Sequence, residues 1–558
     1  MKISNRLFSR KNLIMALFAV FLFLRLFVSS SEILLGADNV KYLIMARNFP
    51  YHTSANGQME IYHGPFYPYV IHFATLVFGQ DYIAFIILSL VSACVTFFIL
   101  YRLFMMLSGN FYAAYAALFL FTLSDELIIA ANSPLKESFT IMLIVASLYF
   151  FIKGVKYYDK KSILISALAG SMLALSVDHV IFLLPAFVLS YIFFNKEKID
   201  FRKFYFPNIK YAAIPFIITL VVYSSWLGAK AYQYSQNESY PAGLEGSPLF
   251  VKDFGIVELL NPVYFKNYDP NLPHGFNTRI RNYAFGLGYM LNMEPFNIPR
   301  GLDLTTMKYL FFPRHVAYMA VIYLPLALLA AYALLWALWN FAKEKKIHNN
   351  SSLYLILVFL IFIFPLTQKI NSPRYIYSDY LILYYFIGLG FFMLLKRMKM
   401  LNFYNVVLPL SIALLLILVP FWYSSNNNLI IFAKKIPKSG NTAEFIKNNL
   451  GKNSVIMAQP GYAYNLMYLI PNRVLGLSPF AKDLPYFIES YGVDYIVFGR
   501  YYTSSKYYYS KDSIDYIKNN PKKFRLVKTI KEDYSGFFNP KDNAATDEVY
   551  IYAIIGKS

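Results

Sequence analysis

Two neighbouring stretches decide the fold: GADNVKYLIMARNF, Gly36–Phe49, and HGPFYPYVIHFATLVFG, His63–Gly79. They follow the first long apolar segment of the chain, and Asp38 lies just beyond the end of that segment. The apolar run Phe66–Gly79 has 14 residues, whereas a helix needs about 20 residues to cross a bilayer. We therefore predict an interfacial or re-entrant helix there. This choice fixes the side of the membrane on which every later loop lies.

The composition is typical of a polytopic membrane protein. Of the 558 residues, 57% are hydrophobic and only 15% are charged, and the mean hydropathy is +0.42. Soluble domains seldom exceed about half apolar residues. The one cysteine, Cys94, excludes an internal disulfide. The first apolar segment, Lys11–Ser30, is too long for a cleavable signal peptide.

About eleven α-helical segments are predicted to span the membrane. With the N-terminus in the cytoplasm, the short inner loops collect basic residues, as the positive-inside rule requires. The loop after the fourth span, for example, carries Lys153, Lys156 and Lys160. If Phe66–Gly79 also crossed the membrane, these basic loops would fall outside. The predicted spans are 12–30, 82–104, 111–131, 135–152, 162–178, 180–195, 211–228, 315–341, 352–369, 373–395 and 403–423.

The formal net charge of +21 is divided among these short loops. We interpret it as a sign of orientation against anionic membrane lipids. Nucleic acid is not a predicted partner, because basic residues scattered over separate loops do not form one binding surface. The predicted location is the cell membrane, with several passes and a cytoplasmic N-terminus.

The chain is predicted to contain two domains. Residues 1–429 form a transmembrane domain that includes a first outer loop at 31–81, with interfacial helices, and a large polar outer loop at 229–314. In residues 430–558, helix-like and strand-like segments alternate and the composition is that of a soluble protein. We predict a C-terminal extracytoplasmic α/β domain there. The chain shows no inverted repeat of the kind that transporters carry.

Ionisable side chains near the outer ends of the predicted spans are the candidates for chemistry. Such groups are costly in a membrane and therefore suggest a function. The inner loops, in contrast, are basic and have few acids, so we expect the site on the extracytoplasmic face. The outer candidates are Asp38, His63, Asp125, Lys136, Glu137, Asp178, His179 and Arg374, with Asp379 about one turn beyond Arg374.

Each candidate also has a structural interpretation, and the sequence leaves both open. Asp38 can cap the N-terminus of a helix over NVKYLIMARNF, and Glu137 can cap the fourth span. Arg374 can extend its side chain to the membrane surface, as can Arg25 near the outer end of the first span. Three further residues can be hydrogen-bonded turn residues, namely His63, Asp178 and His179.

The sequence defines no certain cofactor. The outer loops contain no His-x-x-x-His motif and no cysteine pair. A carboxylate pair formed by Asp38 with Glu137 or Asp125 would offer the oxygen ligands that a hard divalent cation prefers. A divalent metal ion therefore stays an alternative at these three residues.

These stretches resemble the GT-C glycosyltransferases, which include dolichyl-phosphate-mannose protein mannosyltransferases and aminoarabinose transferases. The first outer loop of that family has an acid, then Tyr and Ala-Arg in an amphipathic helix, then a proline-containing segment. Its fourth span opens on Lys-Glu, a late span carries Arg-Tyr, and an extracytoplasmic α/β domain follows. The matching residues here are Asp38, Tyr42, Ala46-Arg47, Pro65/Pro68, Lys136-Glu137 and Arg374-Tyr375.

The resemblance implies transfer of a sugar, with inversion, from a polyprenyl-phosphate donor to an extracytoplasmic acceptor. The leaving phosphate needs a cation to stabilise its developing charge, which Arg374, Lys136 or an arginine of the large outer loop would supply. The acceptor hydroxyl needs one base, and Asp38 is the candidate. The residues expected to bind the donor phosphate or substrate are Arg374, Tyr375, Lys136, Glu137, Arg47, Tyr42, His63, Asp178 and His179.

Two other functions stay open. The same fold can host an oligosaccharyltransferase or a polymer ligase. A transporter or flippase for a lipid-linked substrate belongs to a different class, for which we expect broken helices or charges near mid-membrane. Asn39 replaces a second acid that is frequent in the family, which weakens a metal role for Asp38. The acceptor, whether protein, lipid or glycan, is not defined by the sequence.

Overall fold

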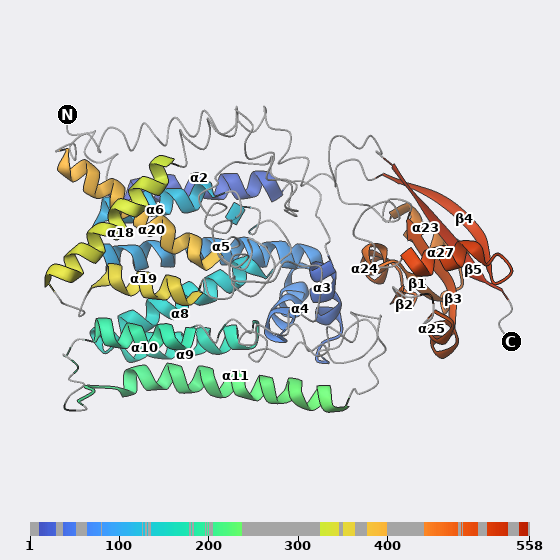
Figure 1. Cartoon of the computed structure of the whole chain (residues 1–558), viewed down its shortest axis with the longest axis horizontal. Coiled ribbons are helices and arrows are strands. Elements are labelled where there is room, and N and C mark those ends of the chain that lie inside the picture. Colours follow the sequence, from blue (N-terminus) through green and yellow to red (C-terminus); the bar gives the residue numbers. More distant parts are fainter. Residues whose placement is uncertain are drawn as a thin grey trace. The chain divides into compact units, whose positions relative to one another are not determined.

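The computed structural model shows apolar helices and a β-sheet that helices flank (Figure 1). The chain divides into two compact units, one within 1–30, 86–227 and 259–429, the other within 31–85, 228–258 and 430–558. The structure describes residues 10–29, 37–51, 64–79, 81–124, 127–128, 131, 136–177, 180, 183–195, 197, 199, 203, 205–236, 324–344, 350–362, 377–398, 440–477, 481, 484–499, 511–533 and 546–555.

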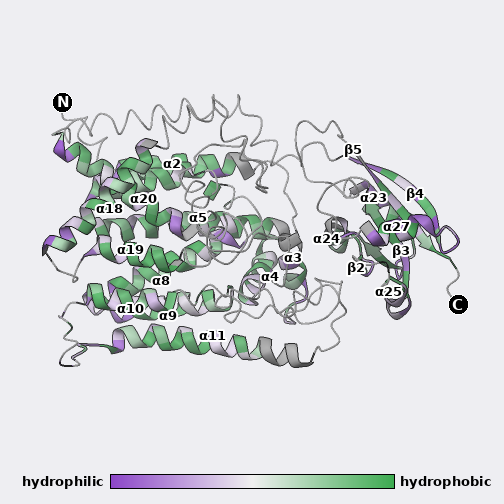
Figure 2. Cartoon of the chain, in the orientation of Figure 1, coloured by the Kyte–Doolittle hydropathy of each residue, from purple (hydrophilic) through white to green (hydrophobic). Residues whose placement is uncertain are grey.

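Apolar helices build the first unit, and they are predominantly green in the hydropathy colouring of Figure 2. Small apolar and aromatic residues cover most of their length, which suits helices surrounded by lipid and by one another. The helices are α2 (Arg10–Ser29), α5 (Asp81–Ser108), α6 (Phe111–Leu123), α8 (Glu137–Tyr157), α9 (Lys160–Ala174), α10 (Leu183–Phe194), α11 (Lys210–Gln236), α18 (Leu324–Glu344), α19 (Ser351–Phe362) and α20 (Tyr377–Arg397).

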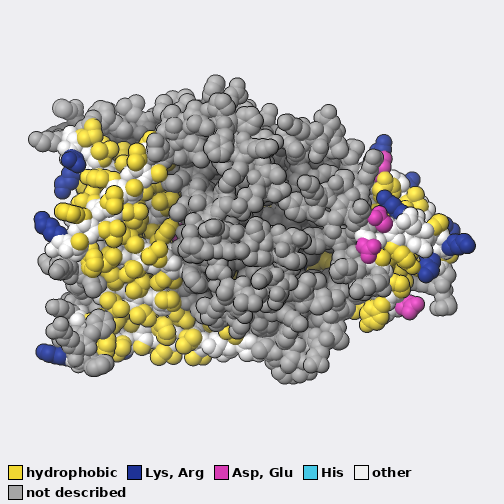
Figure 3. Space-filling view, viewed as in Figure 1, with side chains coloured by type: hydrophobic (Ala, Val, Ile, Leu, Met, Phe, Trp, Pro, Cys, Tyr) yellow, Lys and Arg dark blue, Asp and Glu magenta, His cyan; other side chains and the backbone are white. Residues whose placement is uncertain are grey.

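The predicted membrane class is confirmed. Hydrophobic side chains form a broad band over the helices on the face shown in Figure 3, with Lys and Arg at one edge of the band. The predicted span 403–423 lies outside the described residues, and the number of eleven spans stays a prediction. Among the described residues, five helical segments are long and apolar enough to cross a membrane: Ile83–Ser108, Glu137–Tyr157, Lys210–Ala229, Pro325–Lys343 and Asp379–Arg397.

Close approach of helices in this unit depends on small residues. A Cβ atom added at Gly388 of α20 would lie 2.6 Å from the carbonyl oxygen of Ala113 in α6. At Gly390, an added Cβ would collide with the backbone of Leu329 in α18. Such glycines let helix backbones pack directly against each other within a membrane. They hold α20 against α6 and α18.

The turn between α8 and α9 is fixed by a helix cap. Asp159 accepts hydrogen bonds from the Lys161 N–H at 3.1 Å and from the Ser162 hydroxyl at 2.7 Å. Its carboxylate also lies 3.4 Å from the ammonium group of Lys153. The hydrogen bond from the Ser162 side chain is the main cause that lowers the pKa of Asp159. This cap satisfies N–H groups that the first turn of a helix leaves without partners.

A five-stranded sheet forms the core of the second unit, with strand order β2-β1-β3-β5-β4. Strand β1 pairs in parallel with β2 and β3, while β5 is antiparallel to β3 and β4. The elements are α23 (Gly440–Asn449), β1 (Val455–Ala458), α24 (Pro460–Leu469), β2 (Val474–Gly476), α25 (Leu484–Tyr491), β3 (Val493–Gly499), α27 (Lys511–Asn519), β4 (Phe524–Asp533) and β5 (Thr546–Ile554).

The second unit also contains α3 (Ala37–Arg47) and α4 (Phe66–Phe78), the two stretches that opened the sequence analysis. Helix α4 has 13 residues and ends at Gly79, whose φ of 75° lies in the left-handed region that favours glycine. The predicted short helix is therefore present, whereas its place relative to the membrane stays a prediction. Helix α3 packs against α4 and α24.

Candidate functional site

Three buried ionisable side chains of the first unit lie near helix ends. Arg25 lies one turn before the end of α2, Glu137 begins α8, and Asp379 is the third residue of α20. Arg25 and Asp379 are 0% exposed and Glu137 is 9% exposed. The end where α2 and α6 finish is the end where α8 and α20 begin (Figure 1). Because buried charges among apolar helices are costly, this end of the unit is the candidate site.

Arg25 lies between α2 and α6. Its guanidinium carbon is 3.5 Å from the centre of the Phe21 ring, and its Nη atoms donate to the carbonyl oxygens of Phe121 and Thr122 at 3.4 and 3.3 Å. These carbonyls belong to the last turn of α6, which has no intrahelical donors for them and carries the negative end of the helix dipole. The prediction that Arg25 extends to the membrane surface is therefore wrong, because its side chain is fully enclosed in the protein.

Asp379 is enclosed as completely as Arg25, but its carboxylate differs in its surroundings. Within the described residues, neither of its oxygens has a hydrogen-bond partner. Of the helices that contact α20, the described parts of α6 and α19 contain no charged residue. The sequence prediction mentioned Asp379 but did not include it among the site residues. The signal was an acid at the start of an otherwise apolar span, and burial was the missing information.

Lys136 and Glu137, both predicted site residues, occur where α8 begins. Glu137 is the first helical residue, a position where the free N–H groups of the first turn favour a carboxylate. Lys136 precedes it with helical backbone angles and makes no capping hydrogen bond with its side chain. It is half-buried. The structure thus puts this predicted pair at the same end of the unit as Arg25 and Asp379.

The second unit holds three other predicted residues, all in α3. The helix starts at Ala37, so Asp38 is its second residue and lies in the first turn, not before it. The ring of Tyr42 is buried and packs edge-on against Tyr67, with the two centroids 5.4 Å apart. Arg47 is the exposed last residue of the helix. The ring of Tyr42 thus packs between α3 and α4.

The remaining predicted residues lie outside the described part of the chain. This holds for His63, Asp125, Asp178, His179, Arg374 and Tyr375, and for the side chain of Asp38. Within the described residues, no group of three or more His, Cys, Asp or Glu side chains is arranged to hold a metal ion. Glu137 alone is no ligand set for a divalent cation. The other two acids of the predicted metal alternative, Asp38 and Asp125, have side chains outside the described residues, so that alternative stays a prediction.

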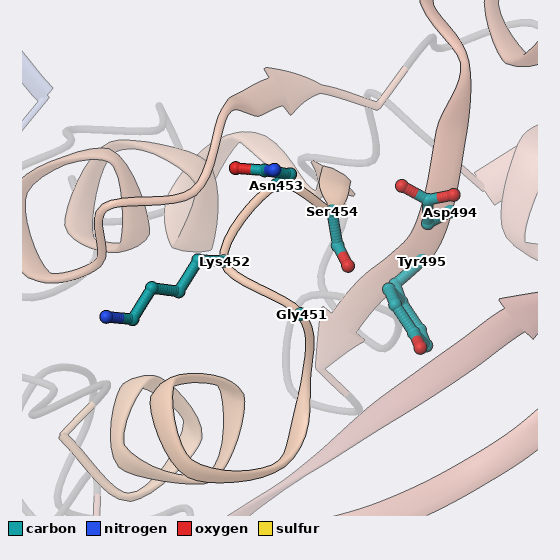
Figure 4. Close-up of a pocket in the computed structure, with 6 residues that line it drawn as sticks. All are labelled: Gly451, Lys452, Asn453, Ser454, Asp494 and Tyr495. Carbon is teal, nitrogen blue, oxygen red and sulfur yellow. The ribbon is translucent and has the colours of Figure 1, made fainter.

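A separate pocket of about 390 Å³ opens on the sheet of the second unit. Its lining comes from the loop before β1 and from the start of β3, and none of the predicted residues takes part. Figure 4 shows Lys452 directed away from Asp494 and Tyr495, which project from β3. Asp494 accepts a hydrogen bond from the Val455 N–H at 2.7 Å. The carboxylate therefore has a structural partner, and the side chains around the pocket do not converge.

Comparison by sequence identifies one family. Residues 62–226 match the family described as dolichyl-phosphate-mannose-protein mannosyltransferase. The match takes in less than a third of the 558 residues, and it includes α4 to α10 and most of α11. A search of curated protein sequences finds no match.

Comparison by structure finds the same architecture in two proteins. The oligosaccharyltransferase of Archaeoglobus fulgidus, in its apo form, has a TM-score of 0.54 and 12% identity, over 88% of this chain and 69% of that chain. ArnT from Cupriavidus metallidurans, bound to undecaprenyl phosphate, has a TM-score of 0.55 and 11% identity, over 97% of this chain and 98% of that chain. At such identities the likeness shows the fold alone.

Proposed function

We propose that this chain is a GT-C glycosyltransferase, which the family match over residues 62–226 and the likeness in fold support, and that it transfers a sugar from a polyprenyl-phosphate donor to an extracytoplasmic acceptor. One observation carries the proposal: Arg25, Glu137 and Asp379 are buried at one end of a bundle of apolar helices. A lipid-linked substrate has its lipid in the membrane and its phosphate and sugar at the membrane surface. Charged groups at the ends of the helices are where such a head group needs them.

The proposed reaction is a single displacement. The acceptor hydroxyl oxygen attacks the anomeric carbon, the bond from that carbon to the phosphate oxygen breaks, and its electron pair leaves with the polyprenyl phosphate. The proton of the hydroxyl passes to Asp38, and the configuration at the anomeric carbon inverts. Arg374 or Lys136 stabilises the charge that develops on the phosphate. Since a phosphate is already a good leaving group, one carboxylate is sufficient where an inverting hydrolase needs two.

The proposed arrangement in the cell follows the charge pattern of the sequence. We propose several passes through the cell membrane, a cytoplasmic N-terminus, and the site and the α/β domain of residues 430–558 on the extracytoplasmic side. The acceptor is a protein, lipid or glycan on that side. A transporter is less well supported, because the buried charges of the described helices lie at their ends and not near their middles.

The test is transfer by purified protein in nanodiscs, with a radiolabelled undecaprenyl-phosphate hexose as donor. We expect Asp38→Asn to lower the rate of transfer by about 10²- to 10⁴-fold, because it removes the general base. Asp159→Asn is the matched control, since Asp159 lies in the turn between α8 and α9 and keeps a capping side chain. If Asp38→Asn transfers sugar as fast as the parent while both variants insert normally, Asp38 is not the base.

A further inference from the structure

Asp379 has no role in the chemistry proposed above, yet its side chain is the most exceptional in the first unit. It is 0% exposed, and neither carboxylate oxygen has a hydrogen-bond partner among the described residues. An ionised carboxylate removed from water without a partner costs several kcal/mol. A fold keeps such a group only if something supplies hydrogen-bond donors to it.

The helices packed on α20 have one described cation at this end, Lys136, which directly precedes α8. Helices α6 and α19 contain no charged residue, and Lys343 of α18 is in the last turn of its helix. In α8, Lys153 and Lys156 are near the other end of the helix. The basic residues of α20 itself, Lys396 and Arg397, are in its last turn. Lys136 is therefore the one described cation of these helices at this end, and the carboxylate of Asp379 accepts no hydrogen bond from it.

Among the described side chains, the charges at this end of the unit are balanced. Arg25 and Lys136 contribute two positive charges, and Glu137 and Asp379 contribute two negative charges. Arg25 is bonded to carbonyl oxygens of α2 and α6, which fixes its guanidinium there. A partner for Asp379 that brings hydrogen-bond donors without net charge therefore suits the site better than an added cation. Hydroxyl groups have this property.

We propose that Asp379 is a donor-binding residue whose carboxylate oxygens accept hydrogen bonds from hydroxyl groups of the lipid-linked sugar. The inference rests on the proposed function, because it takes the sugar of that donor as the ligand. Asp379 lies in the first turn of α20, at the end of the bundle, and Lys396 and Arg397 are the other charged residues of this helix. A head group that enters from this end meets Asp379 first along α20. The bond orients the sugar and takes no part in bond breaking.

The test is a double-mutant cycle between enzyme and substrate in nanodiscs. Parent, Asp379→Asn and Asp379→Glu are each assayed with undecaprenyl-phosphate mannose and with its 2-, 3-, 4- and 6-deoxy analogues. For one deoxy position, we expect removal of the hydroxyl to lower kcat/KM of the parent by about 10- to 100-fold, as for a hydrogen bond to a charged group. The same removal should lower kcat/KM of the Asp379→Asn variant by less than about threefold. Asp379→Glu, which keeps the charge, should keep part of the coupling.

Three outcomes are distinguishable. If the parent transfers sugar and every deoxy analogue lowers the rates of parent and Asp379→Asn equally, Asp379 is a structural residue and the inference fails alone. If the parent transfers no sugar from any such donor, the proposed function fails and the inference fails with it. If Asp379→Asn does not insert into membranes, the cycle is measured with Asp379→Glu instead. Equal losses of kcat/KM in the parent and in Asp379→Glu at every deoxy position then overturn the inference. Asp159→Asn is the control and should show the parent's losses.

Discussion

A single arginine illustrates how this membrane domain treats a charge. Arg25 is enclosed between α2 and α6, where Phe21 covers its plane and the last carbonyls of α6 accept its N–H groups. The polarity of these carbonyls is opposite to that of the guanidinium. The residue thus joins the end of α6 to α2 without any carboxylate. Its side chain stabilises the same end of the unit at which Glu137 and Asp379 are buried.

At this scale we predict that Arg25→Ala lowers the free energy of unfolding by about 2–4 kcal/mol. The variant leaves a cavity and removes the donors of the Phe121 and Thr122 carbonyls. The matched control is Arg10→Ala in the same helix, because Arg10 is exposed and its guanidinium lies 5.4 Å from the Phe111 ring. Thermal unfolding of the purified protein in detergent measures both. Equal melting temperatures for the two variants would contradict the structural role of Arg25.

Sequence reasoning was least successful for individual buried charges. The sequence indicates Asp38, Lys136 and Glu137 as candidates by their places near the outer ends of predicted spans and by their resemblance to family motifs, and their roles stay predictions. Arg25 was interpreted as a surface-seeking side chain, and Asp379 was mentioned but not included in the site. The burial of both side chains depends on which face of their helix another helix covers. A helix that is apolar on all sides contains no such information in its sequence. Only the packing of α2 and α20 on α6 shows it.

Helices in this protein are ended and begun by local signals that the sequence does encode. Helix α4 stops at Gly79, whose positive φ permits a left-handed turn, and α9 begins after Asp159, whose side chain caps it. The short length of α4 follows from this stop signal and agrees with the predicted break in the span pattern.

For the cap of α9 we predict that Asp159→Ala lowers the free energy of unfolding at pH 7 by about 0.5–2 kcal/mol. The folded-state pKa of Asp159 is lowered, mainly by the Ser162 hydrogen bond. The contribution of the cap is therefore complete above the usual aspartate pKa of about 3.9. It is lost as the pH falls below that value and through the lowered folded-state pKa.

Melting curves of the parent and Asp159→Ala between pH 7 and pH 3 test this prediction. The difference in melting temperature should be constant down to about pH 4.5 and then shrink. Asp159→Asn, which keeps a capping oxygen but not the charge, should lie between the two at pH 7. A difference that does not change with pH would show that the carboxylate is not the stabilising form.

The whole molecule combines an apolar helical unit with a unit built around a five-stranded sheet. Hydropathy predicts the membrane class, and short motifs carry the resemblance to the GT-C family. Both are local properties that the sequence contains directly. The predicted domain boundary at residue 429 stays a prediction, and α3 and α4 lie in the same compact unit as the sheet. The packing of α3 against α24 joins residues more than four hundred positions apart, and no local pattern encodes such a contact.

The central claim is that this protein is a glycosyltransferase that takes its sugar from a polyprenyl monophosphate. The most direct measurement reconstitutes the purified parent with radiolabelled undecaprenyl-phosphate mannose or dolichyl-phosphate mannose and with heat-treated membranes as acceptor. Released polyprenyl phosphate and transferred sugar are counted, and the anomeric configuration of the product is determined by NMR. We predict one polyprenyl phosphate released for each sugar transferred, with inverted configuration. Transfer only from diphosphate-linked oligosaccharides, or movement of the donor across the bilayer without transfer, would contradict the claim.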